Sequence, residues 1–299
     1  MISCQKDSII FIPDQTQDIN QEVVFSKILG QKAVYTIPKL DGKYLSISNY
    51  LIKLDSNTLV DDSGKTINSN VRIEFNDAKQ DKLNLIHSKA VIVDGEALNI
   101  SHYFTISFSS LEGNLKIVKP ITIFILTNTD GTQEDEFYTY NVNEKVWKNG
   151  VDQNNIDFGH WDLENDESQL EYTAYRILLN SSNTKAFCVA KPTKMDPTTH
   201  KIKCTLPSEY NHKNTLAYFV SNDSATAFPL TYDKTLGQFT SLELKINPKL
   251  VGDIVIFSDL GNDFYYFGTT NAVIADDKVY DIIPKTFSNE DIRAKMLAL

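Results

Sequence analysis

The chain has 299 residues, of which 41% are hydrophobic and 23% are charged, and this length allows two domains with sizeable cores. Its formal net charge of -10 repels phosphate backbones and anionic lipid head groups, so the composition argues against nucleic-acid binding. No apolar stretch reaches about 18 residues, so the sequence predicts no spanning helix.

The first predicted feature is a lipid anchor on Cys4. The residues before Cys4 are apolar, apolar and small, and they resemble the end of a bacterial lipoprotein signal. Residues 5–8, Gln-Lys-Asp-Ser, resemble the tag that follows the lipidated Cys in Bacteroidetes surface lipoproteins. The resemblance implies acylation of the Cys4 thiol, and two or more acyl chains hold a protein stably at a membrane. The alternative is a disordered start with one free Cys.

Short strand-like runs then recur between residues 33 and 126. Val71–Phe75 and Phe104–Phe108 alternate apolar and polar residues with period two, which is typical of half-buried strands. Turn signals such as Asp61–Gly64 and Asp94-Gly95 separate the runs. Many short strands at this spacing predict a β-sandwich.

The same region carries a family resemblance through its pattern of strands and turns. The segments that carry it are Ile52–Ile67, Val71–Phe75, Asp94–Leu98, Phe104–Ile106 and Val118–Ile121. With them, the stretch 43–124 resembles the N-terminal domain of a group of Bacteroidetes lipoproteins of uncertain role, which is itself similar to the ZU-type β-sandwich of ankyrins and netrin receptors. In the related domains Gly-Met usually precedes the Phe, whereas in this chain His102-Tyr103 precedes Phe104. The resemblance implies a fold and export, and it transfers no catalytic residue.

Four aromatic residues form a candidate glycan platform around the middle of the chain. Trp147 and Trp161 flank an Asn- and Asp-rich stretch, and Tyr138 and Tyr140 precede it. Exposed aromatic rings stack on sugar rings, and nearby Asn and Asp bind sugar hydroxyls. The alternative is that both Trp side chains pack a seam between two domains.

Two acidic segments, 128–136 and 157–167, are candidate metal sites because carboxylates are ligands for calcium and other divalent ions. The first lacks the full twelve-residue calcium loop, and the second fits a charged linker. The sequence also lacks a His-Glu-x-x-His motif, a Gly-rich phosphate loop and a Gly-x-Ser-x-Gly elbow. We therefore predict no metal, no cofactor and no enzymatic activity.

Cys188 and Cys204 lie on either side of an Asp-Pro turn signal at Asp196-Pro197. A turn centred on Asp196 would place the two cysteines opposite each other across a hairpin, where cross-strand residues meet disulfide geometry. Two interpretations remain open, a disulfide in an oxidising envelope or two buried free thiols.

The predicted fold class is all-β, with two β-sandwich domains in series and a short C-terminal helix. The predicted boundaries are a lipoprotein N-terminus and tether at 1–22, a first sandwich at 23–148, an acidic linker at 149–171, a second sandwich at 172–287 and a helix at 288–299. The helix is predicted because Ser288 begins a capping-box pattern before an apolar spacing.

Two functions fit these features. The first is a non-enzymatic exported lipoprotein of the outer membrane that acts as an accessory interaction module with a protein partner at the cell surface or in the periplasm. The second is a glycan-binding lipoprotein for nutrient capture. An exposed flat platform formed by Trp147, Trp161 and the nearby Tyr side chains would favour the second.

Overall fold

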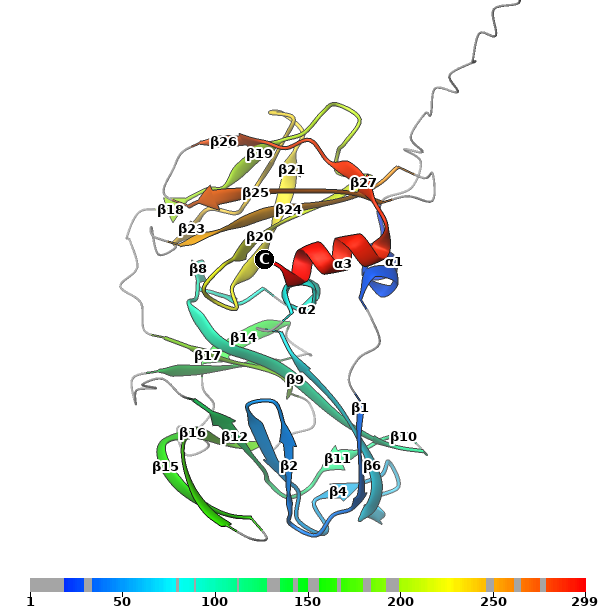
Figure 1. The fold of residues 1–299 in the computed structure, drawn as a ribbon, viewed down its shortest axis with the longest axis vertical. Helices are drawn as coiled ribbons and strands as arrows, with labels where there is room; N and C mark the ends of the chain where they lie inside the picture. The colour runs from blue at the N-terminus through cyan, green and yellow to red at the C-terminus, as the bar shows by residue number, and fades with distance from the viewer. Residues whose placement is uncertain are drawn as a thin grey trace, which may run out of the picture. The chain divides into compact units, whose positions relative to one another are not determined.

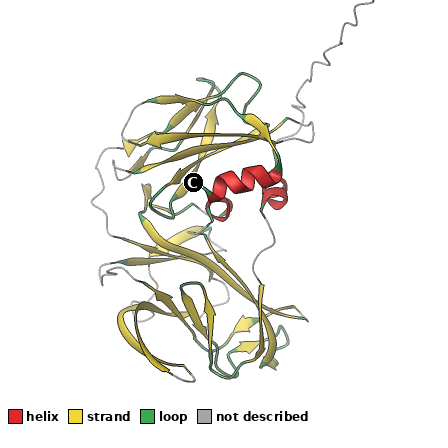
Figure 2. Cartoon of the chain, in the orientation of Figure 1, coloured by secondary structure: helices red, strands yellow, loops and turns green. Residues whose placement is uncertain are grey.

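The computed structural model describes most of the chain as strand, with three helices (Figures 1 and 2). The described residues are 19–29, 34–78, 81–88, 90–111, 113–127, 135–141, 145–149, 156–165, 168–179, 184–191, 199–245, 250–260, 265–274 and 278–299. The predicted all-β class with a short C-terminal helix is confirmed. The chain divides into two compact units.

Unit 2 contains the described residues of Gln31–Lys194, together with Ser224–Thr226. Its helix is α2 (Lys82–His87). Its strands are β1 (Val34–Lys39), β2 (Tyr44–Ile47), β3 (Tyr50–Lys53), β4 (Leu59–Val60), β5 (Thr66–Ile67), β6 (Ser69–Asp77), β7 (Ile92–Val93), β8 (Glu96–Ala97), β9 (Ile100–Ser110), β10 (Gly113–Asn114), β11 (Lys116–Ile117), β12 (Ile121–Leu126), β13 (Glu136–Asn141), β14 (Val146–Asn149), β15 (Ile156–Asn165), β16 (Ser168–Leu179) and β17 (Thr184–Ala190).

Two sheets of unit 2 share one hydrophobic core. The seven-stranded sheet has the order β1-β6-β9-β17-β13-β14, with β10 paired to β9, and the five-stranded sheet has the order β15-β16-β12-β3-β2. Alternate side chains of both sheets are buried in the same cluster, including Ile73, Phe104 and Ile123. The Phe104 ring lies 5.0 Å from the Phe187 ring and 5.2 Å from the Tyr50 ring, measured between centroids. This is the packing of a β-sandwich.

Unit 1 contains the described residues of Met1–Gly30, Met195–Asp223 and Ala227–Leu299. Its helices are α1 (Gln21–Ile28) and α3 (Asn289–Leu297). Its strands are β18 (Thr199–His200), β19 (Lys203–Thr205), β20 (Thr215–Ser221), β21 (Ala227–Asp233), β22 (Gln238–Thr240), β23 (Leu244–Lys245), β24 (Val251–Asp259), β25 (Tyr265–Val273), β26 (Val279–Asp281) and β27 (Lys285–Phe287).

An eight-stranded sheet organises unit 1, in the order β26-β19-β22-β21-β20-β24-β25-β27. Helix α1 packs on the β20–β24 region of this sheet, because the Phe25 ring lies 6.0 Å from the Tyr218 ring and 5.4 Å from the Phe257 ring. On the other face, Phe219 of β20 packs beside its cross-strand partner Phe228 of β21, with ring centroids 5.1 Å apart. Consecutive residues of β20 and β24 are buried, so both faces of these central strands are shielded from solvent.

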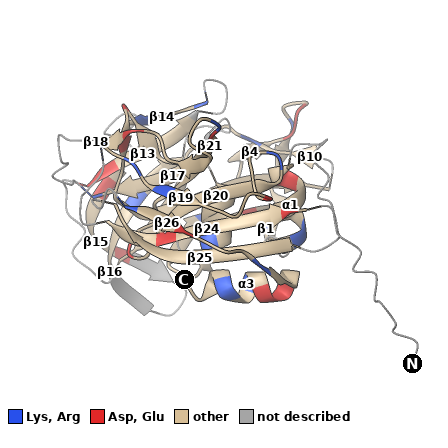
Figure 3. Ribbon diagram, turned by 90° about the horizontal axis from the view of Figure 1, so that it is seen from above, with Lys and Arg blue, Asp and Glu red and all other residues tan. Residues whose placement is uncertain are grey.

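Helix α3 begins where the capping pattern predicts. The Ser288 hydroxyl accepts a hydrogen bond from the Asp291 backbone N–H at 3.1 Å, which satisfies one free donor of the first turn. Ile292 and Met296 are buried, as the predicted apolar spacing requires. Acidic residues lie in the first turn and Lys295 in the last, which complements the helix dipole (Figure 3).

The domain boundaries differ from the predicted ones in three places. Residues 149–171, predicted as a linker, contain β15 and the start of β16, which pair in an unbroken ladder from Ile156–Ile177 to Asn165–Ser168. Helix α1 belongs to unit 1, and β17 belongs to unit 2. The linker prediction is wrong because β15 is an edge strand, which among the described strands pairs with β16 alone, and its polar side chains interrupt the apolar pattern.

Candidate functional site

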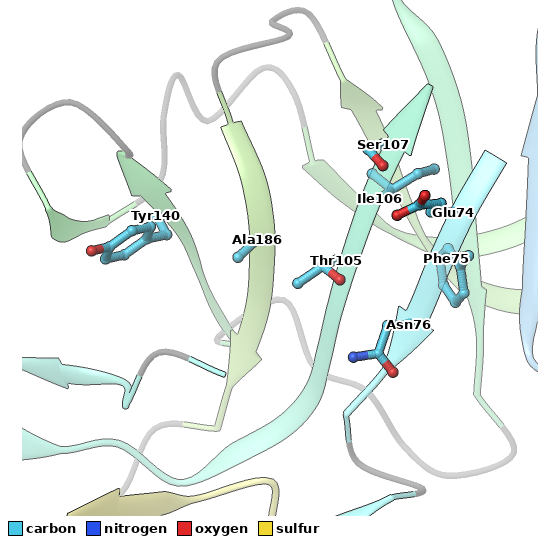
Figure 4. A pocket seen from close by; sticks show the side chains of 8 residues that line it. All are labelled: Glu74, Phe75, Asn76, Thr105, Ile106, Ser107, Tyr140 and Ala186. Atoms are coloured by element: carbon cyan, nitrogen blue, oxygen red, sulfur yellow. The ribbon is translucent and has the colours of Figure 1, made fainter. Parts of the chain in front are cut away.

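A groove lies on the outward face of the seven-stranded sheet in unit 2 and has a volume of about 300 Å³. It crosses four neighbouring strands, β6, β9, β17 and β13. Its lining residues are Glu74, Phe75, Asn76, Thr105, Ile106, Ser107, Tyr140 and Ala186 (Figure 4). Neighbouring strands lie about 4.8 Å apart, so the groove spans three strand spacings, or roughly 14 Å.

The period-two alternation of β6 and β9 places polar side chains on this outward face. In β6, Ile73 and Phe75 are buried in the core, whereas Glu74 between them is exposed. In β9, Phe104 is buried and the adjacent Thr105 is half-buried. The same alternation that forms the core therefore supplies the carboxylate and hydroxyl groups of the groove.

The groove coincides with a change of partner along one edge of β9. The β17 ladder on this edge ends at Thr105. Further along, the Leu115 backbone N–H donates a hydrogen bond to the Phe108 carbonyl oxygen at 3.0 Å. Ile106 and Ser107 lie between these two pairings, and within the described chain no ladder partner meets them on this edge. The interruption opens the sheet beside the polar side chains.

Five of the eight lining residues carry hydrogen-bonding side chains, and the other three are apolar. Glu74 and Asn76 lie at the β6 end, Thr105 and Ser107 lie on β9, and Tyr140 lies at the β13 end (Figure 4). Glu74 is the charged residue among the described lining residues, which include no Lys, Arg, His or Cys. The arrangement is suited to binding a ligand that has both polar and apolar groups.

The predicted glycan platform is not formed by the described structure. Trp147 is only 7% exposed, and its indole N–H donates a hydrogen bond to the Ala90 carbonyl oxygen at 2.9 Å. Tyr138 is also buried, and burial together with a hydrogen bond to Glu136 raises the pKa of its hydroxyl. Both side chains pack inside unit 2, so neither presents a flat ring to solvent.

Trp161 lies on the other sheet of unit 2, on the edge strand β15. The Arg176 guanidinium lies 4.3 Å from the centroid of the Trp161 ring, and the indole N–H donates to the Ala174 carbonyl oxygen at 3.2 Å. The Phe124 ring packs edge-on at 5.8 Å. Trp161 therefore belongs to a small aromatic cluster on the five-stranded sheet, whereas Tyr140 is the predicted platform residue that lines the groove.

Cys188 and Cys204 are free and buried. Cys188 lies on β17 in unit 2 and Cys204 on β19 in unit 1, so the predicted hairpin and the disulfide across it are wrong. The prediction fails because Cys188 pairs with Tyr103 of β9, whereas Cys204 pairs with Phe239 of β22. Burial raises the pKa of both thiols, that of Cys204 to about 12, so neither is poised as a thiolate nucleophile.

The structure bears only partly on the remaining predictions. Cys4 and most of the acidic segment 128–136 lie outside the described residues. In the described part of the chain, no group of three or more His, Cys, Asp or Glu side chains is placed to hold a metal ion. No helix among the described residues has the length and apolar character needed to cross a membrane.

Most of the groove residues were missed by reasoning from the sequence. The signal for the outward position of Glu74 and Thr105 was present, because both lie between apolar residues of alternating strands. Nothing in the sequence indicated that β6 and β9 would share a sheet with β17 and β13. Comparisons of the chain with known protein families, with curated proteins and with solved structures give no match.

Proposed function

We propose that this chain is a non-enzymatic exported lipoprotein that works as an interaction module, and that the groove on the seven-stranded sheet is its binding surface. The observation that carries the proposal is the row of polar side chains across β6, β9 and β13, placed where the β9 ladder is interrupted. Binding sites are concave and contain a few convergent polar groups, and this groove meets that description.

The lipid-anchor part of the proposal rests on the sequence around Cys4. Helix α1 begins at Gln21 and belongs to unit 1, so a chain anchored at Cys4 would be tethered through unit 1. Unit 2, which carries the groove, would then have no lipid of its own. This arrangement suits an outer-membrane accessory protein that holds a binding unit at the cell surface or in the periplasm.

Blocking the groove with a bulky group tests its role. A lipid-free Cys4→Ala protein carrying Ser107→Cys is labelled with a bulky maleimide, and its sedimentation with cell-envelope membranes of the native host is measured. Labelling is selective because Cys188 and Cys204 are buried with raised pKa values. We expect the label on residue 107 to abolish binding.

The matched control carries the same label at Thr122→Cys, on the five-stranded sheet of the same unit. This control and the unlabelled Ser107→Cys protein should both bind. Equal binding with and without the label on residue 107 would contradict the proposal, and so would an unlabelled protein that fails to bind the envelope.

The anchor has a separate test. Mass spectrometry of the protein from its native host should show an N-terminal acylated Cys4. An unmodified N-terminus that retains Met1 would refute the lipoprotein part while leaving the groove experiment intact.

A further inference from the structure

We infer that the ligand of the groove is an uncharged oligosaccharide. The inference rests on the proposed function, because it assumes that the groove is the binding surface, and it adds the chemical class of the ligand. Four properties of the groove carry it: its hydrogen-bonding groups, its charge, its position in the sheet and its size.

The side chains in the groove offer both donors and acceptors close together. The Thr105 and Ser107 hydroxyls each donate and accept, and the Asn76 amide does the same through separate atoms. The Glu74 carboxylate is an acceptor with about four sites. Sugar hydroxyls match this set because each of them also donates and accepts.

The charge of the groove excludes two other ligand classes. The described lining includes no basic residue, so it offers no cation to bind an acidic sugar or a phosphate. A ligand ammonium favours a carboxylate together with an aromatic face within about 6 Å of the cation. Glu74 and Tyr140 lie at opposite ends of the groove, roughly three strand spacings of about 4.8 Å apart, so one cation cannot contact both (Figure 4).

The position of the groove in the sheet argues against a peptide. Peptides that bind sheets commonly add a strand to a free edge and use main-chain hydrogen bonds. Here the strands are interior, and in the described chain Ile106 and Ser107 lack a ladder partner on this edge of β9 before Leu115 donates to the Phe108 carbonyl oxygen. Two residues are too few for an added strand, so recognition must come from side chains.

The size of the groove fits a short ligand. Its volume of about 300 Å³ lies at the lower end of the range of about 300–1,000 Å³ found for small-molecule sites. The groove is elongated, because it crosses four strands, and the half-buried Tyr140 ring gives it an aromatic end. A short chain of neutral sugar units therefore fits better than a single compact metabolite.

A glycan array of neutral, amino and acidic oligosaccharides, probed with the full chain carrying Cys4→Ala, tests the inference. We expect binding to neutral glycans only. Thr105→Val removes one hydroxyl and keeps the β-branched shape, and Glu74→Gln keeps the shape and removes the charge. Each variant should weaken the affinity for the best neutral glycan about tenfold, because each loses a hydrogen bond to the ligand.

Matched controls separate recognition from folding. Thr122→Val on the five-stranded sheet and Glu209→Gln in unit 1 lie outside the groove and should leave the affinity unchanged. All four variants should keep the far-ultraviolet circular dichroism and thermal unfolding of the parent. Preferential binding of acidic glycans, or equal loss in Thr105→Val and Thr122→Val, would overturn the inference.

The envelope assay distinguishes failure of the ligand class from failure of the groove itself. Periodate treatment of the envelope, which cleaves sugar diols, should abolish groove-dependent binding, whereas protease treatment should leave it. Binding that is blocked by the label on residue 107, resists periodate and is lost after protease would overturn the oligosaccharide and keep the groove. Binding that ignores the label would overturn both.

Discussion

Two antiparallel ladders, one in each unit, differ in regularity and in their surroundings. In unit 1, β24 and β25 pair over nine consecutive positions, from Val251–Val273 to Asp259–Tyr265, without a register shift. In unit 2, the β9–β17 ladder contains a shift next to Val189 and ends at Thr105, although β9 continues to Ser110. The regular ladder is structural, and the interrupted ladder borders the groove.

The difference lies in what covers each strand. β24 is buried at consecutive residues from Ile254 to Ser258, so both of its faces are shielded, and α1 packs on one of them. β9 has a core face with Phe104 and Ile106 and an outward face with half-buried Thr105 and Ser107. A strand that is covered on both faces has no side chains left for a ligand, whereas an antiparallel sheet with one open face does.

The largest predicted effect comes from the core beneath the groove. Phe104→Ala removes a fully buried ring that packs against Phe187 and Tyr50, and we expect the free energy of unfolding to fall by about 3–5 kcal/mol. Urea unfolding measures the loss, and hydrogen exchange should locate it in unit 2. Leu111→Ala, at a side chain 88% exposed, should change stability by less than about 0.5 kcal/mol. Equal loss of protection in unit 1 would contradict the division into two units.

A pair of glycines tests the tight packing of the regular ladder. A Cβ added at Gly252 would lie 2.2 Å from the Val220 carbonyl oxygen and 2.5 Å from the Phe219 ring, so Gly252→Ala should destabilise unit 1 by about 1–3 kcal/mol. On the edge strand β15, a Cβ added at Gly159 would lie 4.0 Å from its nearest neighbour, an atom of the Trp161 ring. Gly159→Ala should therefore leave the stability nearly unchanged. Thermal unfolding of both variants makes the comparison. A Gly252→Ala protein as stable as the parent would show that β24 is not closely packed there.

A smaller effect is expected at the cap of α1. The Asn20 side chain accepts hydrogen bonds from the Glu22 and Val23 backbone N–H groups at 3.0 and 3.3 Å, so Asn20→Ala should cost about 1 kcal/mol. Because α1 packs in unit 1, hydrogen exchange should increase in α1 and in β24 and remain unchanged in β9. An increase in exchange confined to unit 2 would contradict the assignment of α1 to unit 1.

The smallest effect at neutral pH concerns the Cys204 thiol. Burial raises its pKa from 9.0 to about 12, so the folded state holds this proton more tightly than the unfolded state does. The contribution to stability is complete below pH 9 and declines as the pH rises from about 9 towards 12. Cys204→Ala should therefore reduce the loss of stability between pH 9 and 10.5, measured by urea unfolding at each pH. Identical pH dependence in parent and variant would show that the thiol titrates normally.

Particular residues show how far sequence reasoning reaches. The alternation in Val71–Phe75 and Phe104–Phe108 predicted two strands, and these segments lie within β6 and β9. The capping pattern at Ser288 predicted the start of α3. The same reasoning failed at 149–171, where the polar side chains of an edge strand hid β15. It also failed at Cys188 and Cys204, because a turn signal does not show which strands it connects. The groove was out of reach because it depends on which strands become neighbours.

The sequence by itself determined the β class, the strand alternation, the capped C-terminal helix and the polar character of the residues that face outward. These properties are local, since they follow from the spacing of apolar side chains and from hydrogen bonds between residues close in the chain. The tertiary structure alone decided that α1 joins unit 1, that Trp147 and Tyr138 are buried, and that Glu74 and Tyr140 border one groove. These outcomes depend on pairing between distant strands, which is selected by the burial of the whole core rather than by any single segment.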